Sequence, residues 1–260
     1  MSYHAYTVRF GDTLSQIALN WLGSADLYRT ILNIDGDPVP DPNQIDVGQF
    51  LLIPRLDNYI TYDVQSGDTL SALADGFLGK ASLQTLILDQ GGAPIANPDS
   101  ITVGQRLRIP VHARISSTLT PRFLANMRYS GTQLTDGRHS FVNHDLGGET
   151  TVTRISEIVY GDMNNVGADE AAVVLSTHTN NTTGYFTSVY CIPADFQQAP
   201  PPFELNLFPA YLGDRFRRQQ FYIANRNVHV WGADRVERLS RHRRFEWYGD
   251  AQALGLIEVF

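Results

Sequence analysis

An internal repeat occupies the first 110 residues and constrains the fold more than any other feature. Residues 6–54 and 62–110 align at a constant offset of 56 without a gap. About half of the aligned positions are identical, and the glycines and prolines that mark turns recur in both copies. Two copies are too few for a solenoid, whose repeats depend on stacking against several neighbours. We therefore expect each copy to fold as a small module of its own.

Each copy begins with the same local signals. A β-prone stretch at 6–8 leads into a Gly-Asp turn, and apolar residues then recur at helical spacing over 14–21. Thr13 and its equivalent Thr69 stand where a helix N-cap belongs. Gln16 completes the pattern of a capping box in the first copy only.

The second half of each copy predicts another helix and a strand. A short helix is expected near Asp26 in the first copy and near Ser82 in the second. A proline-containing loop follows, and an apolar stretch ending at Pro54 or Pro110 predicts a closing strand. The order is β, α, α, β, and the two strands of each copy are expected to pair antiparallel.

The two ends of both copies carry specific motifs. Each copy opens with Tyr-x-Val-x-x-Gly-Asp-Thr-Leu-Ser and closes with Ile-x-Val-Gly-Gln-x-Leu-x-Ile-Pro. These motifs closely resemble the LysM family, a small βααβ module that binds N-acetylglucosamine-containing glycans such as peptidoglycan and chitin. Eukaryotic relatives usually carry cysteine pairs around the module, so their absence here implies a bacterial or phage-like context.

The resemblance also implies a binding site in a shallow groove between the first and last loops of each module. An acetamido group needs a donor, an acceptor and an apolar contact, which loop backbone beside leucine or isoleucine can offer. The implied glycan-binding residues are Gly11, Asp12, Thr13, Leu14, Asn43, Gln44 and Ile45, then Gly67, Asp68, Thr69, Leu70, Asp99, Ser100 and Ile101. The Gly-Asp-Thr segment is also expected to form a turn and to cap the following helix. Asp89 replaces the family-typical Asn33 in the second copy, so equal affinity of the copies is not expected.

The rest of the chain predicts a β-rich domain. We divide the chain into modules at 1–56 and 57–112, a linker at 113–122 and a domain at 123–260. Strand signals fall at 151–160, 170–177, 185–192, 221–224, 228–231 and 256–260, with one short helix near 123–128. The expected fold class is α+β: two βααβ modules followed by a mostly antiparallel sandwich or open barrel.

One loop of this domain partly matches a calcium-binding pattern. Asp162, Asn164 and Asp169 supply oxygen ligands, but Val166 stands where a third carboxylate belongs. We therefore expect an Asx-stabilised loop and no metal. The loop and a later Leu-Gly-Asp-Arg segment weakly resemble an uncharacterised β domain of bacterial envelope proteins.

Signatures of catalysis are absent from the sequence. It has no Gly-x-Ser-x-Gly elbow and no His-Glu-x-x-His motif. His139 and His144 are expected to be surface histidines, and Cys191, the lone cysteine, a buried inert thiol. No enzyme activity and no cofactor are expected, although carboxylate pairs for glycoside cleavage depend on separation in space, which the sequence does not give. A wall hydrolase stays an alternative.

The net charge and the hydropathy of the sequence exclude some classes of binding partner. The net charge is −7, and residues 1–112 hold six basic against twelve acidic residues, so no nucleic-acid partner is expected. No apolar run approaches the ~20 residues of a membrane-spanning helix. The basic segment from Arg235 to Tyr248 is interpreted as an arginine-rich exposed edge strand, with a surface for a protein partner as the alternative.

These observations lead to two hypotheses. The first is a non-enzymatic protein that attaches to peptidoglycan through tandem LysM modules, with the β domain as effector or interaction domain. The second is a structural adaptor in a phage-tail-like or contractile injection assembly. The family implies the cell envelope or an extracellular place, whereas the chain shows no signal peptide at Met1, which agrees with a cytoplasmic or particle-associated place.

Overall fold

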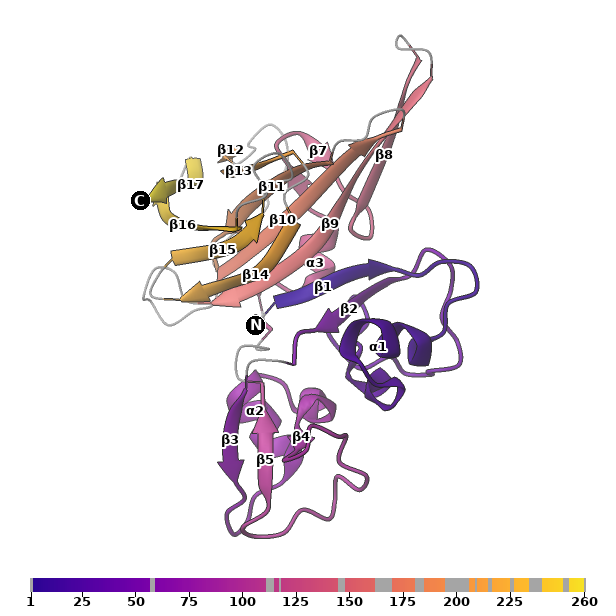
Figure 1. The fold of residues 1–260 in the computed structure, drawn as a ribbon, viewed down its shortest axis with the longest axis vertical. Coiled ribbons are helices and arrows are strands. Elements are labelled where there is room, and N and C mark those ends of the chain that lie inside the picture. Colours follow the sequence, from indigo (N-terminus) through magenta and orange to yellow (C-terminus); the bar gives the residue numbers. More distant parts are fainter. Residues whose placement is uncertain are drawn as a thin grey trace. The chain divides into compact units, whose positions relative to one another are not determined.

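The chain folds into two compact units, Met1–Pro121 and Arg122–Phe260 (Figure 1). The structure is a computed structural model. It describes residues 2–56, 59–110, 115–116, 118–144, 148–161, 170–180, 185–194, 206–208, 210–214, 217–224, 227–233, 240–249 and 253–259.

The first unit contains both repeat copies as βααβ modules, as expected. The first module consists of β1 (Ser2–Thr7), α1 (Leu14–Leu22), η1 (Ala25–Thr30) and β2 (Phe50–Pro54). The second consists of β3 (Ile60–Asp63), α2 (Leu70–Leu78), η2 (Ala81–Leu86), β4 (Leu88–Asp89) and β5 (Arg106–Ile109). In each module the first and last strands pair antiparallel. The second helix is a 3-10 helix in both copies, which the sequence signals did not distinguish from an α-helix.

The helix ends follow the sequence signals with one exception. Thr13 accepts a hydrogen bond from the backbone N–H of Gln16 at 3.2 Å, and Thr69 does the same for Ala72 at 3.1 Å. The predicted capping box forms only in part: the structure has no hydrogen bond from the Thr13 backbone N–H to the Gln16 side chain, whose amide group donates to Asn20 at 3.0 Å.

The two modules share apolar and polar contacts. Leu88 of the second module is only 5% exposed and belongs to the buried cluster of the first module, together with Leu27 and Ile53. The two 3-10 helices also contact each other. On the polar side, Asp37 accepts hydrogen bonds from Lys80 Nζ at 2.7 Å and Ser82 Oγ at 2.6 Å.

The second unit is β-rich, and its two larger sheets are almost entirely antiparallel. The short helix α3 (Pro121–Ala125) lies at its start, which confirms the helix expected near 123–128. Its strands are β6 (Arg128–Tyr129), β7 (Thr132–Gln133), β8 (Arg138–Asn143), β9 (Glu149–Gly161), β10 (Glu170–Thr179), β11 (Tyr185–Ile192), β12 (Asn206–Phe208), β13 (Ala210–Asp214), β14 (Arg217–Ala224), β15 (Asn227–Ala233), β16 (Ser240–Gly249) and β17 (Ala253–Val259).

These strands form two main sheets. One has the order β13-β11-β10-β9 with β8 also on β9, and the other has the order β12-β17-β16-β15-β14. Among the strands described for this unit, β12 and β17 are the pair that runs parallel. Contacts of β14 with β9 and of β17 with β11 bring the two sheets together, as in a β-sandwich. The first half of β10, residues 170–175, is buried, which agrees with the position of β10 between β9 and β11 in its sheet.

The arginine-rich strand differs from the expectation. β16 pairs with β15 on one side and with β17 on the other, so it is an interior strand of its sheet and not an edge. Local sequence could not show this, because the strand that covers the outer side of β16 lies at the end of the chain. Arg241, Arg243 and Arg244 lie on β16, whereas Arg235 and Arg238 lie outside the described residues.

Candidate functional site

The loop after the first strand has the same construction in both modules. Gly11 and Gly67 have φ angles of +85° and +90°, a left-handed conformation that glycine adopts at little cost. In the first module, one carboxylate oxygen of Asp12 accepts hydrogen bonds from the Tyr6 hydroxyl and the Arg9 backbone N–H, both at 2.7 Å. Partial burial and the bond to Asp12 raise the pKa of the Tyr6 phenol.

Asp68 repeats this arrangement in the second module. It accepts from the Tyr62 hydroxyl at 2.8 Å and from the Gln65 backbone N–H at 2.7 Å, and the bond to Asp68 raises the pKa of Tyr62. Both aspartates therefore use a carboxylate oxygen to hold the loop in shape. A ligand at this loop would meet a backbone that is already fixed, which lowers the entropic cost of binding.

The loop before the last strand carries a second repeated turn. Asp41 Oδ1 accepts the backbone N–H of Asn43 at 2.9 Å, and the Asp41 carbonyl accepts that of Gln44 at 3.1 Å. In the second module, Asn97 plays the same part toward Asp99 and Ser100.

The side chains on these turns divide into two groups. Asn43, Gln44, Asp99 and Ser100 are exposed. Ile45 is half-buried and packs against the core of its module, and its equivalent Ile101 is also half-buried.

A pocket of about 290 Å³ lies beside Leu14, the first residue of α1. Its lining residues are Leu14, Tyr28, Arg29, Pro38, Val39, Pro40, Pro42 and Thr85. Leu14 is the one predicted site residue among them, and Gly11, Asp12 and Thr13 precede it directly in the chain. Thr85 comes from the second module, and its buried hydroxyl oxygen has no hydrogen-bond partner among the described residues. The walls are mainly apolar, with the Arg29 guanidinium and the Thr85 hydroxyl as polar groups.

Sequence reasoning missed Tyr28, Arg29 and Thr85 as pocket residues. The motifs that carry the resemblance lie at the ends of each copy, whereas these residues lie on the second helices. The repeat gave no signal for them: Tyr28 and Arg29 align with Gln84 and Thr85, but about half of all aligned positions differ between the two copies.

Other candidate groups do not come together as a site. Among the described residues, no cluster of three or more histidine, cysteine, aspartate or glutamate side chains could hold a metal ion. The weak candidates Asp162, Asn164 and Asp169 lie outside the described residues. Cys191 is 2% exposed on β11, and burial raises the pKa of its thiol well above the ordinary value. No described helix is both long and apolar enough to cross a membrane.

Comparisons with known proteins agree with the module architecture. The LysM domain model matches residues 6–28 and 62–110. Two proteins of Mycobacterium tuberculosis, named Esterase MT1326 (strain CDC 1551 / Oshkosh) and Esterase Rv1288 (strain H37Rv), are each 45% identical over 114 residues. Those residues are 44% of this chain but only 23% of each esterase.

A third relative is similar over a single stretch. Potassium binding protein Kbp of Escherichia coli O6:H1 (strain CFT073) is 45% identical over 49 residues, which are 19% of this chain and 33% of that protein. No solved structure matches the chain. The matched residues, the repeat and the two βααβ folds agree: the N-terminal part of this chain consists of tandem LysM modules, a type of module that binds glycans.

Proposed function

We propose that this chain is a non-enzymatic glycan-binding protein that attaches to peptidoglycan through its two LysM modules. The β-rich unit then serves as the effector or interaction domain, in the cell envelope or outside the cell. The pocket beside Leu14 is the observation that carries the proposal, because its lining contains Leu14 from one segment of the implied groove and Pro42, which directly precedes the other.

The chemistry of the pocket suits an N-acetylated sugar. Leu14, Val39 and the neighbouring prolines offer apolar contacts for an acetamido methyl group, and the Tyr28 ring offers a face for the C–H groups of a pyranose. The exposed Arg29 guanidinium can donate hydrogen bonds to sugar oxygens. A few polar groups in a mainly apolar concavity are typical of small-ligand sites.

Two modules on one chain favour a polymer over a single sugar. Residues 55–61 connect the modules, so binding of one module raises the local concentration of the other at the same strand of glycan. A repeating polymer such as peptidoglycan would therefore be held more tightly than a short oligosaccharide.

The names of the relatives do not extend the proposal to ester hydrolysis or potassium binding. The chain spans less than a quarter of each esterase and a third of the potassium-binding protein. A match of that extent supports a shared module and leaves the remainder of each relative without a counterpart in the alignment.

Co-sedimentation of the full chain with insoluble peptidoglycan tests the proposal. We expect the intact protein to sediment, and Tyr28→Ala to sediment several-fold less at limiting peptidoglycan because it removes one wall of the pocket. Leu19→Ala is the matched control, because Leu19 is an apolar side chain on α1, 47% exposed and outside the pocket. If the intact protein stays in solution while a known LysM protein sediments, the proposal is wrong.

A further inference from the structure

One wall of the pocket beside Leu14 is a segment with few backbone hydrogen bonds of its own. Residues 38–42 read Pro-Val-Pro-Asp-Pro, and four of these five residues line the pocket. Proline has no backbone N–H, so three of the five cannot donate a backbone hydrogen bond. The Val39 N–H donates to the Ile31 carbonyl over a long 3.4 Å. The position of this segment, which we call the proline wall, therefore depends on the residues that flank it.

The residue before the proline wall is held by the second module. Asp37 directly precedes the wall, and each of its carboxylate oxygens accepts a separate hydrogen bond. Oδ2 accepts from Lys80 Nζ at 2.7 Å, and Oδ1 accepts from Ser82 Oγ at 2.6 Å. Lys80 Nζ also donates to the Asp35 carbonyl at 3.3 Å. Two donors on two oxygens restrict rotation of the carboxylate, and they tie the start of the wall to the other module.

The repeat shows that this anchor is an addition to a turn that both copies contain. The Asn33 side chain accepts the backbone N–H of Asp37 at 3.2 Å, and Asp89 does the same for Ala93 at 2.8 Å. Asp37 aligns with Ala93, which has no side-chain acceptor. The turn thus forms without a carboxylate at this position, and the contact with the other module exists only for the first copy.

Lys80 departs from the local pattern of the repeat. It stands at the N-cap of η2 and makes no side-chain cap there, as expected for lysine. At the equivalent position, Ser24 caps η1 by accepting the Asp26 backbone N–H at 3.3 Å. The single lysine of the chain therefore replaces a good capping residue and contacts Asp37 instead. A local rule broken in this way is typical of residues that serve a site elsewhere.

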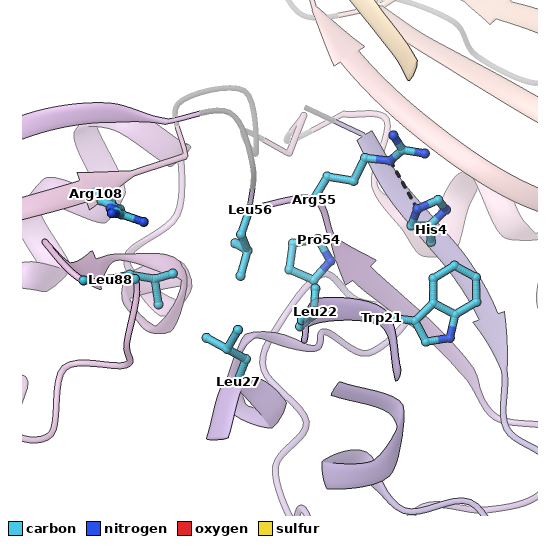
Figure 2. Close-up of a pocket in the computed structure, with 11 residues that line it drawn as sticks. His4, Trp21, Leu22, Leu27, Pro54, Arg55, Leu56, Leu88 and Arg108 are labelled. Atoms are coloured by element: carbon cyan, nitrogen blue, oxygen red, sulfur yellow. Dashed lines mark hydrogen bonds between the residues drawn. The ribbon is translucent and has the colours of Figure 1, made fainter. Parts of the chain in front are cut away.

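The second module also contacts the first through apolar side chains. Leu88 is buried in the core cluster of the first module, and Leu27 and Leu88 line one concavity between the modules (Figure 2). Thr85, on the same short helix as Ser82, lines the pocket beside Leu14. The helix η2 thus supplies both a part of the pocket lining and the donors that hold Asp37.

We propose that the second module positions the pocket of the first, because Lys80 and Ser82 hold Asp37 and Asp37 sets the position of the proline wall. These three are positioning residues, since none of them lines the pocket. The inference rests on the proposed function for its ligand and adds how the site is controlled. The two modules then act as one binding unit, in which the first site needs the second module even when the second module holds no sugar.

Two measurements on the full chain test this role, one with ligand and one without. NMR titration with a water-soluble N-acetylglucosamine oligomer gives the affinity of each module separately, from the amide signals of Tyr28 and Val39 and from those of Gly67 and Thr69. Hydrogen exchange of the Val39 amide without ligand measures how firmly the proline wall is held.

Asp37→Ala is the first variant, because Ala93 shows that the turn accepts alanine. The side chains of Asp37 and Lys80 are 37% and 39% exposed, and ion pairs this exposed contribute modestly. We therefore expect the affinity of the first module to fall about two- to fivefold and Val39 exchange to quicken by a similar factor, with the second module unchanged.

Variants of Lys80 separate positioning from a general loss of stability. Lys80→Ala should reproduce the effects of Asp37→Ala, and Lys80→Arg should restore both readouts because a guanidinium also donates to a carboxylate. The double variant should lose no more affinity than either single variant, since both remove the same contact. Arg106→Ala is the matched control. Arg106 pairs with Asp63 at 2.9 Å and neither residue lines the pocket, so both readouts should stay unchanged.

Three results would overturn the proposal: Val39 exchange and first-module affinity that are unchanged in Asp37→Ala, equal losses of affinity in both modules, or additive losses in the double variant. Failure of the proposed function looks different, because the oligomer would then not bind the unaltered chain. In that case Val39 exchange alone decides whether the second module positions the proline wall.

Discussion

Truncation of Leu88 is expected to destabilise both LysM modules, although the residue belongs only to the second. Leu88 is 5% exposed and lies in the buried cluster of the first module. Leu→Ala changes in protein cores cost about 2–5 kcal/mol, depending on how far the surroundings close the cavity. A concavity of about 560 Å³, lined by residues of both modules, borders Leu88, so neighbouring side chains can relax or water can enter (Figure 2). We therefore expect Leu88→Ala to cost about 2–3 kcal/mol, in the lower half of that range.

The assay is urea unfolding of the full chain, followed through backbone amide signals of Leu52 in β2 and Leu107 in β5. Both signals should lose stability together, because the cavity opens in a core that the modules share. Val103→Ala is the control, since this side chain is 70% exposed and its truncation should change stability by less than about 0.5 kcal/mol. A loss confined to Leu107, or one below about 1 kcal/mol, would refute the shared core.

The remaining predictions concern single groups. Thr13→Ala and Thr69→Ala should each cost about 1 kcal/mol in urea unfolding, because each removes a hydrogen-bonded helix N-cap, and unchanged stability would show that neither cap matters. Although partial burial opposes it, hydrogen bonds from Lys80 and Ser82 lower the pKa of Asp37 below its ordinary value of about 3.8. Its contribution to stability is thus full above that value and is lost as pH falls through the lower folded pKa, and Lys80→Ala should flatten this part of the pH profile. Cys191 should react with iodoacetamide only after unfolding, and rapid alkylation of the native protein would contradict its burial.

The modules were predictable because their signals are local. Thr13 and Thr69 cap the helices as their positions in the sequence indicate, and the antiparallel pairing of first and last strands follows from the short length of each copy. The resemblance to the LysM family, which rests on the motifs at both ends of each copy, added the expectation of a βααβ fold. The Gln16 capping box forms only in part because a glutamine side chain can also reach forward, and Asn20 lies one turn away on the same helix face.

The concavities were not predictable, because they depend on contacts between segments far apart in the chain. Thr85 reaches the pocket beside Leu14 of the other module, and Arg108 lines the same concavity as Trp21 and Leu27 only because the modules pack together. The same limit explains the error for β16, whose outer neighbour is the last strand of the chain. The charge and hydrophobic periodicity of a segment do not show which distant segments of the chain pack against it.

The central claim is that the loops of the LysM modules bind glycan, and NMR titration of the full chain with a water-soluble N-acetylglucosamine oligomer tests it most directly. The account predicts shifted amide signals at Gly11–Leu14 and at residues 38–45, with corresponding shifts around Gly67–Leu70 if the second module binds as well. Shifts confined to the β-rich unit, or none at an oligomer concentration that saturates a known LysM protein, would contradict it.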